Sequence, residues 1–306
     1  MIPGPIRDMK YRLPVAVNHG NLSYPYWRSK ESIERALSGC ALTFVASVGR
    51  EGSGFVGEIF SANDGLISFH EPRPFCNGRR LIASCINGHA SQSLILRVKV
   101  STIAASIVNS GCRHYLESSH MFLKTFGRYL IKEIDVPFNL ISLRRPILKT
   151  IASFRELAWF GSRYNRAQNW VYKVADGTPL TSRQLRIDNE TDQILSYIIS
   201  EKINELNFVS RASPSRVNYV RLNVPPSKEN LLSVSESIGL SGSVRQDLRK
   251  ANTRQSAKIS QVETETLLKE TRDYFKKNEE MLRQRSVIFC SEDMQMTIGD
   301  EHWGVC

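Results

Sequence analysis

Short apolar runs separated by turn signals make up the first third of the chain, and this pattern limits its fold more than any other feature. Residues 41–48 (ALTFVASV) lead through GREGSG to residues 55–60 (FVGEIF), and SANDG then leads to residues 66–70 (LISFH). Runs of this length between glycine, asparagine and aspartate are typical of strands. Asp64-Gly65 favours a tight hairpin turn, because glycine readily adopts the positive φ that such turns require. We therefore expect a hairpin at this turn.

Two β-branched runs follow, at residues 93–100 (SLILRVKV) and 101–108 (STIAASIV). Valine, isoleucine and threonine favour strands, although the second run is also compatible with a buried turn of helix. Together with the earlier runs they predict a small, mostly antiparallel sheet within residues 40–110.

The hydrophobic pattern becomes helical from about residue 115. Residues 115–134 have helical spacing, and Pro146 is well placed in the first turn of a helix that Gly161 would end. Asn189 and Asp192 have the spacing of a helix N-terminal cap. The apolar residues after this cap recur with the spacing of one helix face: Ile194, Leu195, Ile198, Ile199, Ile203 and Leu206.

A last amphipathic helix is predicted over Glu263–Arg285. Apolar side chains recur there at every seventh position, as in Leu267, Tyr274 and Met281, but the stretch is too short for a sustained coiled coil. We expect this helix to pack on its own domain, with self-association through Glu263–Arg285 as the alternative. The residues after it, EDMQMTIGDEHWGVC, are interpreted as an acidic tail.

The chain is therefore predicted to be an α+β protein, with a small, mostly antiparallel sheet in its N-terminal third followed by a predominantly helical C-terminal part. We divide it into four parts by composition and periodicity. These are a β-containing region at 1–115, a helical basic and aromatic region at 116–210, a connector at 211–231, and a helical C-terminal region with the acidic tail at 232–306.

The charge balance points to an anionic partner. The 306 residues include 41 lysines and arginines against 30 acidic residues, a formal net charge of +11. Such an excess favours nucleic acid or an acidic membrane surface as a partner. The first residues, MIPGPIRDMKYRLP, do not resemble a signal peptide, and no apolar run reaches the roughly 18 residues of a membrane span. Six scattered cysteines are typical of free thiols, so we expect a cytoplasmic protein.

One glycine motif suggests phosphate binding but lacks its usual context. Gly52, Gly54 and Gly57 match GxGxxG, whose glycines let backbone amides approach phosphates. A dinucleotide site needs a helix directly after the loop, whereas a strand is predicted here. The strand context resembles the glycine-rich loop of protein kinases, but the next lysine is Lys99 and no other kinase motif follows. We therefore interpret the segment as a flexible hairpin and reject a nucleotide fold.

Metal binding and covalent catalysis find little support. Cys76, Cys85 and His89 partly match a CCCH zinc finger, and Cys112 with His114 would complete four ligands if the fold brought them together. We expect buried free cysteines and ordinary histidines instead, and leave open whether these five residues bind a metal. No catalytic residue, metal or cofactor is assigned, and the chain is expected not to be an enzyme.

The most informative stretch is the basic and aromatic tract at residues 143–173. Its cations have a single acidic neighbour, Glu156, and a second basic run follows at 244–258. Arginine and lysine bind phosphates, and interleaved aromatic rings stack on unpaired bases. The predicted nucleic-acid-binding residues are Arg144, Arg145, Lys149, Arg163, Arg166, Lys173, Arg245, Arg249, Lys250 and Arg254. The predicted base-stacking residues are Trp159, Tyr164 and Trp170.

These features predict a non-enzymatic protein that binds single-stranded RNA with little sequence preference, of nucleocapsid or ribonucleoprotein-organising type. A basic groove would hold the phosphates, and unpaired bases would stack on the rings. The first alternative is a matrix-like or transport protein whose basic face meets an anionic membrane or partner proteins. The second is an enzyme that acts on nucleic acid.

Overall fold

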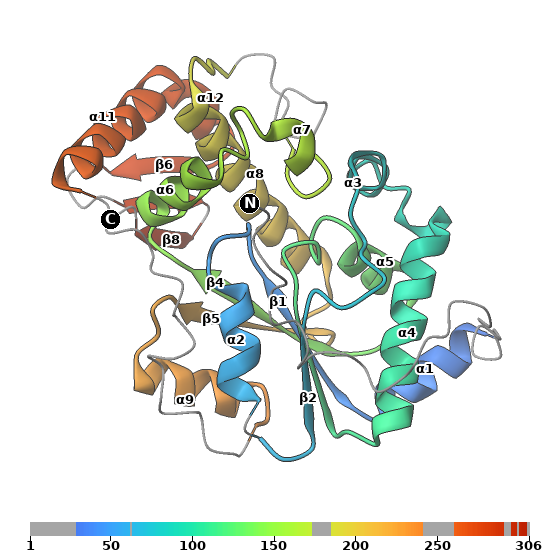
Figure 1. Ribbon diagram of the computed structural model, residues 1–306. Helices are drawn as coiled ribbons and strands as arrows, with labels where there is room; N and C mark the ends of the chain where they lie inside the picture. The colour runs from blue at the N-terminus through green and yellow to red at the C-terminus, as the bar shows by residue number, and fades with distance from the viewer. Residues whose placement is uncertain are drawn as a thin grey trace, which may run out of the picture.

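A five-stranded parallel sheet forms the centre of the molecule, which is seen here in a computed structural model (Figure 1). The structure describes residues 29–61, 63–172, 185–240, 260–290, 295–298 and 300–304. Within these residues the strands lie in the order β2-β3-β1-β4-β5, and every neighbouring pair is parallel. Their bounds are β1 Ala41–Ala46, β2 Leu66–His70, β3 His114–Ser118, β4 Phe138–Arg144 and β5 Val217–Asn223.

Helices cover both faces of this sheet. On one face, α2 (Ser53–Phe60) and α9 (Lys228–Ser237) enclose an apolar cluster that includes Val45. On the other face, helices enclose a second cluster that includes Phe44. Neighbouring residues of β1 thus serve opposite cores, and nearly the whole strand is buried, as expected for a parallel sheet covered on both sides. The helices of the second face include α1 (Lys30–Ser38), α4 (Leu94–Ser110) and α5 (Phe126–Glu133), with α3 (Arg79–Ile86) and the short 3₁₀ helix η1 (Ala90–Gln92) near them.

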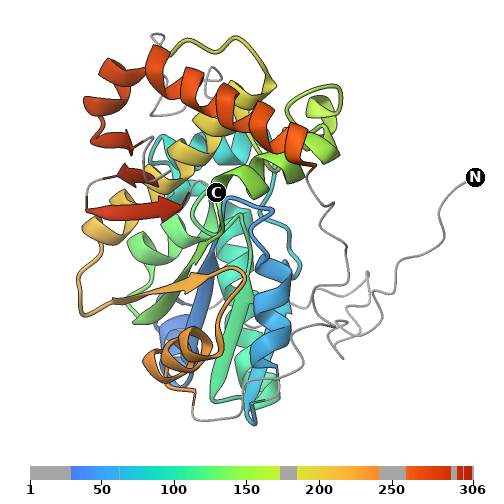
Figure 2. The ribbon, with the colours of Figure 1, turned by 90° about the vertical axis from the view of Figure 1, so that its left-hand side faces the viewer.

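A second, smaller body lies beyond the carboxyl ends of the strands (Figures 1 and 2). Its core is a third cluster built around α8, which carries buried Ile194, Tyr197 and Ile198. Three short antiparallel strands close this body near the end of the chain. Its elements are α6 Ile147–Leu157, α7 Tyr164–Ala167, α8 Glu190–Arg211, α11 Gln261–Lys277, α12 Glu279–Arg283, β6 Val287–Cys290, β7 Gln295–Ile298 and β8 Glu301–Gly304.

The predicted fold class is therefore wrong: the protein is α/β, not α+β with an N-terminal antiparallel sheet. Residues 55–60, predicted as a strand, belong to helix α2, so Asp64-Gly65 joins a helix to a strand and makes no hairpin. Gly65 does adopt the expected positive φ, at 74°. Six of the eight residues of α2 are buried. A short apolar run that is buried on most sides has no clear periodicity, which is why helix and strand could not be told apart.

The runs at 93–100 and 101–108 are likewise no strands but parts of one 17-residue helix, α4. Its apolar residues are spread around the helix, because it packs between α1, α5 and the sheet. Burial against several neighbours outweighs the modest preference of valine, isoleucine and threonine for strands.

Several local predictions are confirmed. Strands occur at 41–46 and 66–70. Asn189 caps α8 in a capping box with Asp192, and the apolar stripe that follows faces the core of the smaller body. The predicted helix at 263–285 is divided into α11 and α12, whose Leu267 and Tyr274 are buried within the same chain.

The C-terminal part is not only helical, since the predicted acidic tail contributes β7 and β8 to the antiparallel sheet. In β8, Trp303 is 2% exposed and packs in the core of the smaller body. Among the described helices, none has the length and apolarity needed to cross a bilayer.

Candidate functional site

The carboxyl edge of the parallel sheet brings together the loops that leave its five strands. In doubly wound sheets, ligands bind outside this edge, at the point where connections leave neighbouring strands toward opposite faces. The central strand β1 is such a point: its connection enters α2 on one face, whereas that of neighbouring β3 enters α5 on the other (Figures 1 and 2). The residues that follow β1 and β3 therefore lie where a ligand of such a sheet would bind.

The loop after β1 carries the three glycines of the GxGxxG motif, and each has a structural reason. Gly52 has a φ of 94°, which turns the chain sharply into α2. A side chain at Gly54 would touch the Nε2 atom of His70 at 3.4 Å. Gly57 lies so close to β2 that a Cβ would be 2.9 Å from the Oγ of Ser68. Gly52 and Gly57 thus have two roles of the motif, the tight turn and the close packing of helix on strand.

Backbone amides at the start of α2 are available to a ligand. The N–H groups of Val48 and Gly49 are already bonded, to the Glu51 carboxylate and the Ser47 hydroxyl. Those of Gly52, Ser53 and Gly54 have no hydrogen-bond partner among the described residues. Free amides at a helix N-terminus attract anions, because the helix dipole adds partial positive charge there.

A nucleotide site was rejected from the sequence because a strand, not a helix, was predicted after the glycines. That strand prediction is wrong, since α2 begins at Ser53, within the motif itself. Two departures from known patterns remain. Gly49 and Gly54 have the GxxxxG spacing of a triphosphate-binding loop. Phe55 and Val56 follow them, where that loop has a lysine and a serine or threonine. In addition, β3 lies between β1 and β2, which are neighbours in the usual dinucleotide fold.

A pair formed by a buried histidine and a half-buried glutamate adjoins the glycine loop. Glu71 follows β2 directly, and its Oε1 lies 2.5 Å from the Nδ1 of His120, which follows β3. A Cβ on Gly49 would be 3.7 Å from the His120 ring, so the ring lies against the loop. The Glu71 backbone has a φ of 49°, a costly conformation that its N–H bond to the Ser118 carbonyl helps to hold.

The two groups of this pair have different charges at neutral pH. Burial lowers the pKa of His120, and the nearby Lys124 ammonium lowers it further, which outweighs the effect of Glu71. Burial raises the pKa of Glu71, but the hydrogen bond from His120 brings it below its usual value. Glu71 is therefore ionised and His120 neutral. Sequence reasoning missed both, since only a parallel sheet brings the residues after β2 and β3 to one edge.

A network of buried charged side chains contacts the loop through Glu51. Lys202 of α8 lies 3.0 Å from Glu51 in the loop and 3.7 Å from Glu205, and its Nζ donates to the Leu143 carbonyl at 3.0 Å. All three ionic side chains are at most 2% exposed. Arg144 joins the network 3.7 Å from Glu205. The loop is thus tied to β4 and α8 by contacts that are shielded from water.

Lys124, one turn after His120, belongs to a neighbouring buried group. Its Nζ donates to the Trp170 carbonyl at 3.1 Å and lies 3.8 Å from Glu201. Burial lowers the pKa of Lys124. Glu201 also accepts a 2.5 Å hydrogen bond from the Tyr172 hydroxyl, which places that predicted tract residue in the interior.

The structure places the predicted RNA-binding cations in different environments. Arg144 is 8% exposed, donates to Tyr219 and Glu301, and stacks 4.1 Å over the Trp303 ring. Arg145 is half-buried and donates to the Arg50 carbonyl. Arg144 is thus enclosed by the fold, whereas Arg145 is half-buried and keeps part of its surface. This explains two of the cations that the sequence left unpaired.

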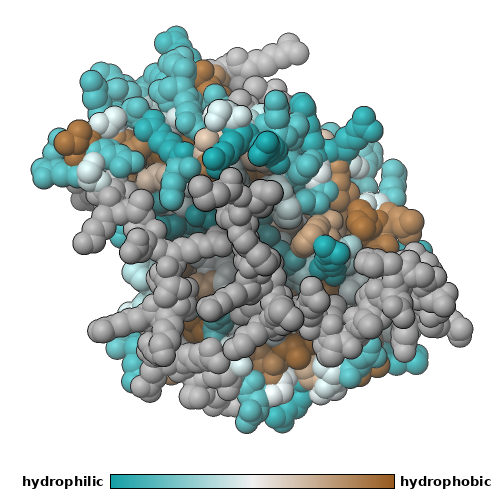
Figure 3. Space-filling view, in the orientation of Figure 1, coloured by the Kyte–Doolittle hydropathy of each residue, from teal (hydrophilic) through white to brown (hydrophobic). Residues whose placement is uncertain are grey.

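Three other cations of the tract are exposed: Lys149 on α6 and Arg163 and Arg166 around α7. None has an ion-pair partner among the described residues. Hydrophilic residues predominate on the surface of this upper part of the molecule (Figure 3). The rings predicted to stack on bases, Trp159, Tyr164 and Trp170, are half-buried against the core of the smaller body. Lys173, Arg245, Arg249, Lys250 and Arg254 lie outside the described residues.

The residues considered for a metal do not meet. Among the described residues, no three histidine, cysteine or acidic side chains are grouped as metal ligands would be. Cys76 and Cys85 are buried in the core, and burial raises the pKa of these thiols to about 12 and about 11. The Sγ of Cys112 instead lies 3.8 Å from that of Cys40.

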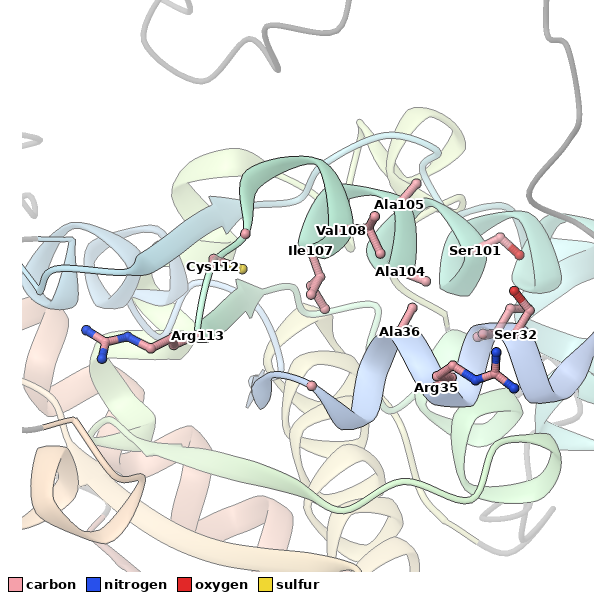
Figure 4. A pocket seen from close by; sticks show the side chains of 13 residues that line it. Ser32, Arg35, Ala36, Ser101, Ala104, Ala105, Ile107, Val108, Cys112 and Arg113 are labelled. Carbon is pink, nitrogen blue, oxygen red and sulfur yellow. The ribbon is translucent and has the colours of Figure 1, made fainter.

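A pocket of about 550 Å³ opens at the opposite, amino end of the sheet, between α1 and α4 (Figure 4). Ala36 and Ala104 face each other across it, and Ser32 and Ser101 lie together near one end. Cys112 lines the pocket just before β3. Its volume suits a small molecule, but its walls carry few convergent polar groups, which are what identify a specific ligand.

The geometry at the carboxyl edge thus combines a glycine loop with free amides, a histidine–glutamate pair and exposed cations on the adjoining helices. Comparison with known proteins adds no family to this description. The chain matches no protein-family model and no curated protein sequence.

Proposed function

We propose that the protein binds a nucleotide at the carboxyl edge of its parallel sheet, with phosphate on the loop between β1 and α2. The observation that carries this proposal is the glycine loop itself: Gly52 makes the tight turn of the motif and Gly57 its close packing of helix on strand. The free amides of Gly52, Ser53 and Gly54 supply the donors that a phosphate needs. Because Phe55 replaces the lysine of triphosphate loops, a mono- or diphosphate is favoured over a triphosphate with its magnesium ion.

The proposal is tested by thermal unfolding with ADP, GDP, CDP and UDP. A nucleotide that binds only the folded state raises the melting temperature, by an amount equivalent to about 2.7 kcal/mol at a concentration 100 times its Kd. Gly54→Ala adds a methyl group to the loop, 3.4 Å from the His70 ring and without requiring a positive φ, so it should weaken the shift and leave the free protein folded. Gly39→Ala, at the other end of the sheet, is the matched control, because its Cβ has only one neighbour, at 3.8 Å.

Two results would count against nucleotide binding at this loop. One is that none of the four diphosphates shifts the melting temperature of the wild-type protein. The other is that Gly54→Ala and Gly39→Ala respond to the nucleotide as the wild type does.

Single-stranded RNA remains a second candidate, which the exposed cations Lys149, Arg163 and Arg166 favour. Helix α6 adjoins the glycine loop, since Ser153 accepts a 2.9 Å hydrogen bond from the Arg50 side chain. An RNA strand along α6 and α7 would therefore pass close to the proposed nucleotide site. Phosphate contacts of this kind weaken steeply with salt.

The RNA proposal is tested by fluorescence anisotropy with a labelled single-stranded oligonucleotide. Replacing Lys149, Arg163 and Arg166 by Gln should weaken binding and flatten its salt dependence. A control with Arg35, Arg80 and Arg113 replaced by Gln removes the same charge from exposed positions elsewhere. Equal losses in both variants would indicate a general charge effect. Flotation with anionic vesicles in place of RNA binding would favour the membrane alternative.

A further inference from the structure

One polar atom beside the glycine loop is buried without a partner. The Nε2 atom of His120 is inaccessible and has no hydrogen-bond partner among the residues that the structure describes. The whole residue is 7% exposed, and its ring lies between Trp170, at a centroid distance of 5.5 Å, and the position of a Gly49 side chain. An unpaired buried polar group is costly, about 1–3 kcal/mol, so it calls for an explanation such as a bound molecule or a functional role.

The bond on the other side of the ring determines what Nε2 can do. A carboxylate only accepts hydrogen bonds, so Glu71 requires the proton of the neutral imidazole to lie on Nδ1. Nε2 then carries a lone pair and can only accept. Its partner must therefore donate a hydrogen bond. An ionised phosphate oxygen has no proton to donate, and this excludes the phosphate part of a nucleotide.

The donors of a ribonucleotide are its ribose hydroxyls and the amino or imino groups of some bases. In the glycine-loop fold, the acidic residue that ends the second strand accepts a hydrogen bond from a ribose hydroxyl. Glu71 holds that chain position, nineteen residues after Gly52, but β3 separates β2 from β1 and the Glu71 carboxylate is bonded to His120. The ring of His120, which follows the intervening strand, lies against the loop at Gly49, and its Nε2 is an unpaired acceptor.

We propose that the Nε2 atom of His120 accepts a hydrogen bond from a ribose hydroxyl, so that the site selects ribonucleotides over deoxyribonucleotides. This inference rests on the proposed nucleotide site and names the sugar that it takes. Glu71 acts as a positioning residue, because it holds the imidazole in the tautomer with a free Nε2. The cost of leaving a buried acceptor unpaired is what disfavours a deoxy sugar.

The test compares dissociation constants, measured by calorimetry, for ADP and its 2′-deoxy and 3′-deoxy analogues. We expect one of the two analogues to bind about tenfold more weakly than ADP, the effect of losing one buried hydrogen bond. In His120→Leu the ratio should fall to about one, because the acceptor is gone. His120→Gln, whose amide oxygen can replace Nε2, should retain part of it. Each ratio is measured on a single variant, so a partly unfolded sample does not change it.

The possible failures are distinct. If ADP and the other diphosphates do not bind at all, the proposed nucleotide site itself is wrong. If ADP and both deoxy analogues bind equally, the nucleotide site stands and the ribose contact is overturned. Discrimination that persists in His120→Leu also overturns it. If ADP binds more tightly than IDP but neither deoxy analogue binds more weakly than ADP, the donor to Nε2 belongs to the base. That result would refute the ribose assignment.

Discussion

The two ends of the parallel sheet bring together different side chains, charged at the carboxyl end and mainly apolar at the amino end, although the same strands run through both. At the carboxyl end, α8 contributes Lys202 and Glu205 to a buried ion network, and His120 pairs with Glu71 beside the glycine loop. At the amino end, an apolar pocket between α1 and α4 is lined by alanines and by Cys112.

The difference follows from how parallel strands are connected. All loops that leave the strands gather at one end, where their free amides and polar side chains can converge on a ligand. The amino ends are reached from helices, and only packing is required of them. The comparison predicts that disturbing the carboxyl end affects both stability and binding, whereas the amino end responds mainly through local packing and thiol chemistry.

The largest effect is expected from Lys202→Met. This change leaves Glu51 and Glu205 buried without their shared cation, which should cost about 3–5 kcal/mol of unfolding free energy. The measurement is urea denaturation at neutral pH. Lys30→Met, at the amino end, is the control: it removes a cation whose side chain is 55% exposed, so a loss of at most about 1 kcal/mol is expected. Similar losses for both variants would contradict the contrast between the two ends.

A smaller effect is expected from Gly52→Ala. With a φ of 94°, this position forces an alanine into the left-handed region, at a cost of about 1–2 kcal/mol. Gly39→Ala, with a φ of −78°, should be neutral or slightly stabilising, because alanine restricts the unfolded chain. Urea denaturation of both variants checks this pair. An undiminished stability in Gly52→Ala would show that the loop tolerates other backbone conformations.

At the amino end, the sharpest prediction concerns thiol reactivity. The hydrogen bond between the Cys40 and Cys112 thiols lowers the pKa of Cys112, so Cys112 should be the more reactive thiol. Iodoacetamide should therefore label Cys112 well before Cys76 and Cys85, as followed by peptide mass spectrometry over time.

Cys40→Ala is the decisive variant for this prediction. It removes the hydrogen-bond donor, so the pKa of Cys112 should rise and its labelling should slow. If Cys112 of the wild type is labelled as slowly as Cys76, then Cys40 does not lower the pKa of Cys112.

The smallest expected effect is a pH dependence of stability that originates at His120. Its folded-state pKa lies below the ordinary 6.5, because of burial and the Lys124 charge, with Glu71 opposing and His70 adding a minor contribution. Below pH 6.5 the unfolded chain takes up a proton that the folded chain does not. Stability should therefore fall as the pH drops from neutrality to about 5.5.

The comparison with His120→Leu isolates this contribution. In the wild type Glu71 stays ionised over this interval, because its pKa lies below 4.5. The stability of His120→Leu should fall less over the same interval, because this variant lacks the imidazole. The check is urea denaturation of both proteins at the two pH values. Parallel pH profiles would assign the wild-type loss to other groups.

The parts of the fold that could be predicted are those governed by local rules. The capping box of Asn189 and Asp192 depends on two side chains three residues apart, and the stripe through Ile194 and Ile198 on the helical repeat. The part that failed was the periodicity of α2 and α4, which are buried on several sides and so lack a polar face. Reading them as strands led directly to the wrong fold class.

The candidate site shows the same division. The GxGxxG spacing was visible in the sequence, but its context was misjudged because α2 was taken for a strand. The His120–Glu71 pair could not be found, since the two residues lie 49 positions apart and meet only where β2 and β3 run parallel. Glu71, directly after the strand predicted at residues 66–70, was an available signal. His120 lies in residues 115–134, which were predicted as a helix, whereas β3 occupies His114–Ser118.

By itself, the sequence determined the excess of positive charge, the positions of β1 and β2, and the start of α8, because composition, short apolar runs and caps act over a few residues. Only the tertiary structure decided which cations are free. Arg144 and Lys149 look alike in the sequence, yet one is enclosed by Glu205, Glu301 and Trp303 and the other faces water. The reason is that burial of a charge depends on partners brought from distant parts of the chain, and no local pattern records them.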